Sequence, residues 1–382
     1  MSRACRTLCL LTVFIPSLLH AVESPAWRLA QPDWKYVFPR DHGPHREFKT
    51  EWWYATGNLV DVPAEAKGRE HEYGFQLTFF REGIQSGTKQ EGSSRFRVTE
   101  LPFAHFAFTD VQGQTFKFFQ QSSRGAFGEA GFATPPEKMP GRIAWMNDWV
   151  LEQPSRPDAQ KNQMSFHLKA SSEGRSVDLI LTQTHEPLIH GENGISPKSD
   201  KPGHASHYYS LTRLQASGTV SIDGKSHAVH GTVWFDHEWA SNSLAPDEVG
   251  WDWSGLHLSN GDDLMLFRIR DAQGKTVFRS GTLREANGVT QDIKDLELIS
   301  ESVWKSPHTQ GSYPSSWKVS IPSQNLELSL YPKLVDQELV LTPFAYWEGA
   351  VKGTGMRQNK PIAVEGYFEM TGYGGKILGM TQ

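Results

Sequence analysis

Residues 71–79 read HEYGFQLTF, a stretch in which apolar and polar side chains alternate at every second position. One face of this stretch carries His71, Tyr73, Phe75, Leu77 and Phe79. A period of two is typical of a half-buried β-strand, because successive side chains point to opposite faces of a sheet. The same alternation recurs at residues 164–169, 177–181, 326–330 and 362–370. The sequence therefore predicts an all-β protein.

Two Asx-Gly dipeptides mark the tight turns expected between such strands. Asp223-Gly224 interrupts the alternation between residues 220 and 235, and Asn260-Gly261 interrupts it between residues 251 and 269. Both dipeptides favour the two-residue turns of β-hairpins. No amphipathic helical pattern is longer than about three turns. We therefore expect antiparallel sheets that stack or close into barrels, rather than a parallel α/β sheet.

The length of the chain and a faint internal repeat both indicate two domains. The chain has 382 residues, and a domain has roughly 150. An aromatic cluster that reaches a glycine precedes a Leu-x-x-Phe-Arg strand twice, at residues 53–81 and again at residues 251–268. Alternation is interrupted between these copies, at residues 240–248. We predict an N-terminal domain over residues 22–240 and a C-terminal domain over residues 241–382.

The first 21 residues have the features of a secretory signal peptide. Arg3 and Arg6 precede an apolar run over residues 8–19, and a small residue follows at Ala21. This order predicts export and cleavage, and so a periplasmic or secreted protein. Cys5 and Cys9 lie within this segment, so the mature chain would contain no cysteine. No later apolar run is long enough to predict a transmembrane segment.

Composition narrows the kind of partner. The formal net charge is −5, which gives no electrostatic support for nucleic-acid binding. Aromatic residues make up 12% of the chain, with 13 Trp, 21 Phe and 10 Tyr. Tryptophan and phenylalanine are common in strands and in the walls of ligand cavities. The composition therefore favours β structure that binds a ligand, and the family resemblance described below implies that this ligand is a lipophilic small molecule.

The densest group of chemical side chains is WFDHEW at residues 234–239, followed by Trp251-Asp252-Trp253. A histidine between carboxylates can donate or accept a proton near neutral pH. Tryptophan rings can hold an apolar chain or stabilise a cation. These properties make the group a candidate acid/base site next to the predicted domain boundary. The alternative is structural, with the acids solvated at a strand end and the tryptophans in the core.

A second group is EWWY at residues 51–54. Glu51 either acts as a buried acid inside a barrel or pairs with an arginine such as Arg81. Two His-x-x-His pairs, at residues 204–207 and 227–230, have a spacing that places their members on opposite faces of a strand. No metal motif and no phosphate-binding glycine loop is present. We therefore expect neither a metal nor a cofactor.

Several of these blocks resemble the carotenoid 1,2-hydratase (hydroxyneurosporene synthase) family, and more closely its exported AttH-like branch, whose members are often labelled secreted hydrolases. The similar blocks are EWWYATGNL at 51–59, YGFQLTFFR at 73–81, HYYS at 207–210, WFDHEW at 234–239, GWDW at 250–253 and GYFEMTGY at 366–373. The resemblance implies two lipocalin-like β-barrel domains in tandem. It also implies hydration of an isoprenoid double bond or, in the AttH-like branch, association with ABC-transporter components.

The resemblance also assigns roles to individual residues. A His-x-Trp pair, which the hydratases use together with a downstream Tyr-x-Asp, is matched by His237 and Trp239. The following strand reads LMLFR at residues 264–268 and lacks the second motif. In the hydratase interpretation His237, Asp236 and Asp252 are the acid/base candidates. The expected ligand-binding residues are Trp239, Trp251, Trp253, Glu51, Trp53 and Tyr54.

Two other interpretations remain open from the sequence. The protein could be a non-catalytic, periplasmic lipophilic-ligand-binding partner of an ABC transporter. Alternatively, it could be a tryptophan-rich carbohydrate binder or glycosidase that uses Glu51 and Asp252 as its carboxylate pair, which requires both acids to face one cavity.

Overall fold

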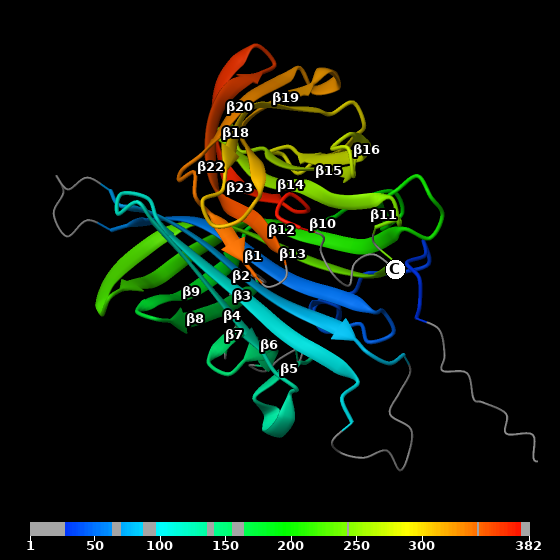
Figure 1. The fold of residues 1–382 in the computed structure, drawn as a ribbon, viewed down its shortest axis with the longest axis vertical. Coiled ribbons are helices and arrows are strands. Elements are labelled where there is room, and N and C mark those ends of the chain that lie inside the picture. The colour runs from blue at the N-terminus through cyan, green and yellow to red at the C-terminus, as the bar shows by residue number, and fades with distance from the viewer. Residues whose placement is uncertain are drawn as a thin grey trace, which may run out of the picture.

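The computed structural model describes residues 27–62, 70–86, 97–135, 141–154, 164–242, 244–341 and 344–375 (Figure 1). The predicted signal peptide, with Cys5 and Cys9, lies outside the described residues. Almost every described element is a β-strand. The exceptions are three short 3-10 helices: η1 (Arg40–His42), η2 (Ala126–Gly128) and η3 (Pro322–Gln324). The predicted all-β class is confirmed. Among the described residues no helix is long and apolar enough to cross a membrane.

The first sheet has the strand order β4-β3-β2-β1-β13-β12-β9-β8-β7-β6-β5, and two short strands, β10 and β11, also pair with β12. All of its pairings are antiparallel. Its strands are β1 (Thr50–Asp61), β2 (Glu72–Gly83), β3 (Glu100–Asp110), β4 (Thr115–Ser122), β5 (Ala130–Phe132), β6 (Gly141–Met146), β7 (Trp149–Gln153), β8 (Ser165–Ser172), β9 (Arg175–Gln183), β10 (Leu188–Ile189), β11 (Ser196–Pro197), β12 (Ala205–Ile222) and β13 (Lys225–Asn242).

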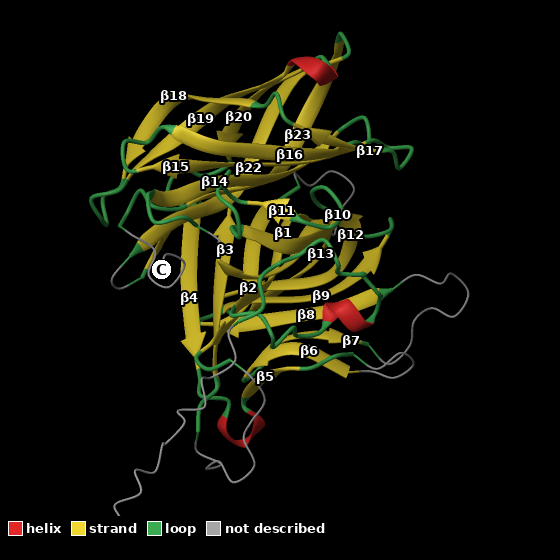
Figure 2. Ribbon diagram, turned by 90° about the vertical axis from the view of Figure 1, so that its right-hand side faces the viewer, coloured by secondary structure: helices red, strands yellow, loops and turns green. Residues whose placement is uncertain are grey.

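The second sheet has the order β17-β16-β15-β14-β23-β22-β20-β19-β18, and β21 also pairs with β22. Its strands are β14 (Glu248–Leu258), β15 (Asp263–Asp271), β16 (Thr276–Arg284), β17 (Thr290–Ile293), β18 (Glu297–Lys305), β19 (Ser312–Ile321), β20 (Leu326–Pro332), β21 (Glu338–Val340), β22 (Ala345–Arg357) and β23 (Lys360–Met370). Each sheet curls around its own apolar core, and the two curled sheets lie one above the other (Figure 2). The chain thus forms two tandem lipocalin-like units, as predicted.

Both predicted hairpins are present. Asp223 and Gly224 connect β12 to β13 with φ values of 49° and 81°, and Ile222 pairs with Lys225. A two-residue hairpin turn of this kind requires positive φ at both positions, which Asp tolerates and Gly adopts without strain. Gly261 has a φ of 92° in the connection between β14 and β15. On either side of the Asp223-Gly224 turn, β12 and β13 extend for 18 residues each, with register shifts in their pairing at Ala205/Ser206 and at Leu211/Leu214.

Strand β13 separates two environments. Its residues Phe235 and Trp239 belong to the core inside the first sheet, whereas Trp234 belongs to a third apolar cluster that lies between the two sheets. This third cluster also contains Tyr54 from β1 and Trp253 from β14. Strands β1 and β2 contact β23 and β22 of the second sheet. The two units therefore share a buried apolar interface in addition to their own cores.

Polar contacts join the two units at the edges of this interface. The Asn58 side-chain amide donates to the Gly366 carbonyl at 3.1 Å, and the Thr212 hydroxyl donates to Asp263 at 2.8 Å. The first sheet ends with Asn242 and the second begins with Glu248. The predicted domain boundary at residues 240 and 241 lies near this change of sheet. The division into domains at residues 22–240 and 241–382 stays a prediction.

Candidate functional site

A cleft lies between the two sheets, at the interface just described. It is lined by Trp52, Tyr54, Thr78, Phe80, Lys198, Asp236, Glu238, Leu244, Trp251, Trp253, Phe267, Ile269, Tyr346, Glu348 and Glu369. The cavity volume is about 80 Å³, whereas pockets for drug-sized molecules usually measure roughly 300–1,000 Å³. In this conformation the cleft can hold a small group or one end of a larger molecule.

The cleft is built from equivalent parts of the two units. In the first sheet Trp52 lies opposite Phe80 on β2 and Glu238 on β13. In the second sheet Trp253 lies opposite Phe267 on β15 and Glu369 on β23. Each unit therefore contributes a tryptophan, a phenylalanine and a glutamate from three adjacent strands. This correspondence agrees with the internal repeat seen in the sequence.

Asp236 is held in the wall of the cleft by three donors. The Tyr208 hydroxyl donates to Oδ2 at 2.8 Å, and Ser210 Oγ and Trp234 Nε1 donate to Oδ1 at 2.5 and 2.7 Å. These hydrogen bonds favour the carboxylate, but burial outweighs them and raises the pKa of Asp236 to about 7. Trp253 Nε1 donates to the Tyr208 hydroxyl at 3.1 Å, so the wall is ordered across both units.

Glu348 and Glu369 form a carboxyl pair on the opposite wall. They lie directly opposite each other on β22 and β23. Burial raises the pKa of Glu369 to about 7, although Trp251 Nε1 donates to its carboxylate at 3.0 Å. Burial and the negative charge of Glu369 raise the pKa of Glu348 well above its ordinary value. A pair of this kind holds a proton at neutral pH.

Lys198 supplies a positive charge to the same cleft. Its Nζ lies 2.8 Å from Glu238 Oε1. Lys198 Nζ also lies over the rings of Tyr208 and Phe267, at 4.9 and 4.6 Å from their centroids. The ammonium group of Lys198 therefore makes cation–π contacts with two rings of the cleft, which shows that a positive charge fits beside these rings.

The acid/base candidates from the sequence do not share one pocket. Asp236 lines the cleft, but His237, its neighbour on β13, points to the opposite face. His237 Nε2 lies 2.9 Å from Glu51 Oε1, and its ring stacks on Trp53 at 4.6 Å between centroids. Adjacent side chains of a strand point to opposite faces of the sheet, so Asp236 and His237 cannot line the same pocket. The expectation of a single site is corrected for this reason.

The predicted ligand-binding residues are divided in the same way. Trp251, Trp253 and Tyr54 line the cleft. Glu51, Trp53 and Trp239 are buried inside the first sheet. Glu51 pairs with Arg81 at 2.9 Å, which is the structural alternative that the sequence left open for this acid.

Asp252 lies neither in the cleft nor inside the first unit, but in the interior of the second unit. Its carboxylate accepts from Arg268 Nε at 2.6 Å and Arg270 Nε at 3.2 Å, and it is fully buried in the second unit. Asp252 and Arg268 lie opposite each other on β14 and β15, as Glu51 and Arg81 do on β1 and β2. Neither Glu51 nor Asp252 lines the cleft. The cleft therefore does not bring Glu51 and Asp252 together, as a glycosidase mechanism that uses these two carboxylates would require.

Three charged residues that line the cleft were not identified from the sequence: Lys198, Glu348 and Glu369. Lys198 lies in a loop between β11 and β12, where no periodicity predicts its direction. Glu369 stands next to Phe368 within the GYFEMTGY block, and this charged residue among apolar ones was a usable signal. Glu348 in AYWEGA at residues 345–350 carried the same signal. What the sequence could not supply is their pairing across two strands.

The fold and the cleft define a tandem lipocalin-like protein with an aromatic, carboxyl-rich cavity between its units. The AttH-like family model matches residues 29–373, so the chain belongs to the AttH-like family. The crystal structure of a protein assigned as AttH from Nitrosomonas europaea is similar, with a TM-score of 0.76 and 31% identity. That similarity covers 91% of this chain and 99% of the other.

Two more distant relatives are also similar. Kievitone hydratase from Nectria haematococca has a TM-score of 0.65 at 15% identity, covering 92% of this chain and 94% of that one. At this identity the likeness concerns the fold alone. A dehydratase, asqC, from Emericella nidulans is 21% identical over 273 residues, which is 69% of this chain and 70% of the relative.

We predict that Asp252→Asn destabilises the fold. The substitution leaves two arginines without their counter-charge, and breaking a buried ion pair costs about 3–5 kcal/mol. The free energy of unfolding, measured by urea denaturation, should fall by that amount. Glu301→Gln is the control, because it breaks an exposed pair with Lys318 and should leave the urea midpoint unchanged. A fully stable Asp252→Asn protein would contradict the structural role.

We also predict a pH-dependent effect of Glu369→Gln on stability. Folding raises the pKa of Glu369 from 4.5 to about 7. The folded state therefore holds this proton more tightly than the unfolded chain does, and the resulting stabilisation is lost as the pH rises through 7. Glutamine carries no charge at any pH. We compare the free energy of unfolding of the variant with that of the wild type. As the pH goes from acidic to mildly alkaline, this difference should shift in favour of the variant by roughly 2–3 kcal/mol.

The measurement is the urea midpoint of both proteins over that pH range. Glu365→Gln is the matched control on the same strand, since the Glu365 side chain is 56% exposed. A stability difference between Glu369→Gln and wild type that does not change with pH would show that burial leaves the proton of Glu369 unaffected.

Proposed function

We propose that this protein is a hydratase-type enzyme that adds water to a carbon–carbon double bond, or removes it, in a lipophilic molecule held at the inter-sheet cleft. The observation that carries the proposal is the buried Glu348–Glu369 pair, which faces aromatic side chains of both units across one cavity. Two relatives are named as a hydratase and a dehydratase, which supports chemistry of this type.

The cleft contains the groups that hydration of an alkene requires. Glu369 donates a proton to one carbon of the double bond, and the other carbon becomes a cation. The rings of Trp52 and Trp253 line the cleft and stabilise this cation, whereas the Phe267 ring already lies under Lys198. Water then forms the new carbon–oxygen bond, and the proton that it releases returns to the glutamate pair. The acid is regenerated, and the net reaction joins one alkene and one water molecule to give one alcohol.

Asp236 has a different part in this scheme. Three donors from the protein fix its carboxyl group in the wall of the cleft. A fixed acceptor in this position orients the attacking water toward the cation. His237 and Asp252 act elsewhere in the structure. The proposed acid therefore shifts from the histidine expected from sequence to a glutamate of the second unit.

The size and the lining of the cleft support a lipophilic substrate with a small reacting end. About 80 Å³ accommodates a terminal double bond with its methyl groups, while the remainder of a larger molecule lies outside or displaces side chains. An isoprenoid, or another lipophilic molecule with a terminal alkene, meets this requirement. Export to the periplasm or to the medium is part of the proposal and is supported by residues 1–21 of the sequence.

The alternative function is non-catalytic binding of a lipophilic ligand, in partnership with ABC-transporter components. It uses the same aromatic lining but gives the glutamate pair no chemical part. The two functions differ in a single respect, the fate of the bound molecule.

The test is an incubation of the protein, purified from its natural source, with the lipophilic molecule that native mass spectrometry finds bound to it. In water labelled with heavy oxygen, the wild type should incorporate the label into that molecule. Glu369→Gln should reduce the rate by about a hundredfold or more while retaining the bound molecule, because only the acid is removed. Glu365→Gln should react at the wild-type rate.

Retention of the molecule without incorporation by the wild type would favour the binding function. A bound oligosaccharide would contradict both lipophilic interpretations. Unchanged turnover by Glu369→Gln would remove this residue from the mechanism.

A further inference from the structure

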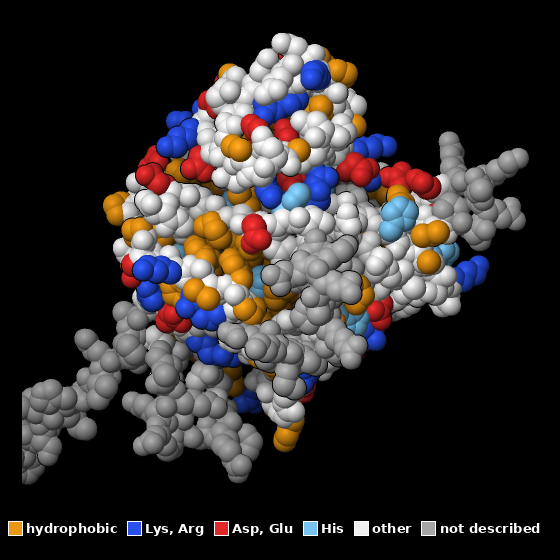
Figure 3. Space-filling view, turned by 180° about the vertical axis from the view of Figure 1, so that it is seen from behind, with side chains coloured by type: hydrophobic (Ala, Val, Ile, Leu, Met, Phe, Trp, Pro, Cys, Tyr) orange, Lys and Arg blue, Asp and Glu red, His pale blue; other side chains and the backbone are white. Residues whose placement is uncertain are grey.

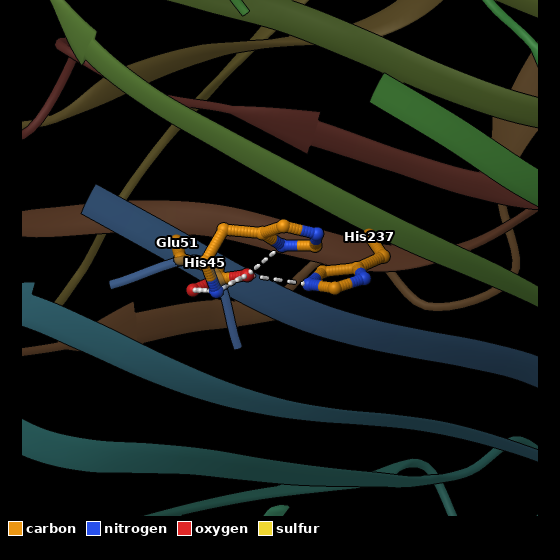
Figure 4. A group of neighbouring side chains, drawn as sticks. All are labelled: His45, Glu51 and His237. Carbon is orange, nitrogen blue, oxygen red and sulfur yellow. Dashed lines mark hydrogen bonds and ion pairs between the residues drawn. The ribbon is translucent and has the colours of Figure 1, made fainter. Parts of the chain in front are cut away.

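His45, Glu51 and His237 converge inside the first unit, on the opposite side of β1 and β13 from the cleft (Figure 4). His45 Nδ1 lies 2.7 Å and His237 Nε2 lies 2.9 Å from the same oxygen, Glu51 Oε1. All three residues are buried, with exposures of 6%, 0% and 0%. They come from the segment before β1, from β1 and from β13, so only the folded chain brings them together.

The ring nitrogens of both histidines lie between acceptors. His45 Nε2 faces Asp41 Oδ1 at 3.3 Å, and His237 Nδ1 faces the Asp41 backbone carbonyl at 2.9 Å. Their other nitrogens face Glu51 Oε1. A neutral imidazole carries a single N–H, so two neutral rings can satisfy only two of these four contacts. In the remaining two contacts a ring nitrogen lone pair faces an oxygen, although the Tyr209 hydroxyl, 3.3 Å from His237 Nδ1, can donate to that nitrogen.

These contacts are satisfied either by additional ring protons or by one divalent cation bound between the two rings and Glu51. Two protonated rings would lie 5.5 Å apart between centroids, both buried, and would repel each other. A divalent cation carries the same total charge at one place, so the exchange of two protons for one ion leaves the net charge of the cluster unchanged.

The surroundings match those of a metal site. Ligating histidines usually donate their second N–H to a carboxylate or a backbone carbonyl, as both rings here can do to Asp41. Arg81 Nε donates to Glu51 Oε2 at 2.9 Å, and the His45 backbone N–H donates to both carboxylate oxygens, at 3.1 Å for Oε1 and 2.9 Å for Oε2. In a tetrahedral zinc site neighbouring ligand atoms lie roughly 3.3 Å apart, so the present distances require the side chains to separate by about half an ångström.

We propose that His45, Glu51 and His237 bind a divalent transition-metal ion of the zinc class. The ion connects the segment before β1 to β1 and β13, two strands whose other faces carry Trp52, Tyr54 and Asp236 of the cleft. This site is independent of the proposed hydration. The spacing argument from sequence considered histidine pairs within single strands and therefore did not include this combination.

The experiment measures bound metal in the full chain, purified after growth with added zinc sulfate and analysed by inductively coupled plasma mass spectrometry. The wild type should carry one zinc ion per chain. His237→Gln should lower the metal content about tenfold or more. His167→Gln is the matched control, because His167 also lies between two carboxylates, Glu152 at 3.0 Å and Asp178 at 2.8 Å, but has no second histidine. It should retain the wild-type metal content.

A second measurement on the wild type covers the case in which His237→Gln does not fold. The chain is unfolded in denaturant in the presence of a chelator, which removes bound metal. It is then refolded without metal, with zinc or with cobalt. Zinc should raise the thermal midpoint, and cobalt should give the visible absorption of a nitrogen- and oxygen-ligated ion. Wild-type protein that refolds to the same midpoint with and without zinc, and that binds no metal, would overturn the proposal. So would a folded His237→Gln protein that keeps its metal.

Discussion

The structure depends on strand β13, because one of its faces packs in the core of the first unit and the other lines the cleft. Residues with odd numbers, such as Phe235, His237 and Trp239, face the core of the first unit. Residues with even numbers, such as Asp236 and Glu238, face the cleft. Because a strand gives its residues only two directions, six consecutive residues serve two sites that have no side chain in common. The same division applies to EWWY on β1.

The buried acids of this protein have different environments on the two sides of the sheets. Inside each unit an acid pairs with arginine from the adjacent strand: Glu51 with Arg81, and Asp252 with Arg268. In the cleft, Glu348 and Glu369 face each other. Although burial opposes it, the charges of His45 and Arg81 lower the pKa of Glu51, whereas burial and the charge of Glu369 raise the pKa of Glu348. The cleft therefore holds carboxyl groups whose pKa values are raised, unlike the Glu51 carboxylate inside the first unit.

Much of the architecture could be predicted from particular residues. The alternation at residues 71–79 predicted β2, Asp223-Gly224 predicted the longest hairpin, and the repeated Leu-x-x-Phe-Arg strand predicted two similar units. These signals are local, since strand period and turn conformation depend on a few neighbouring residues. The candidate site was predicted less well. Tryptophans 251 and 253 and Asp236 do line the cleft, but the glutamates of β22 and β23 were not recognised.

The sequence by itself determined the class of fold, the positions of the turns, the tandem organisation and the family resemblance. It did so because each of these is encoded within short stretches of chain. Only the tertiary structure decided which side chains share a cavity. Glu348 meets Glu369 through strand pairing, and His45, in the segment before β1, meets His237, 192 positions further along the chain, inside the first unit. Such encounters depend on strand order and sheet curvature, which no local pattern of residues specifies.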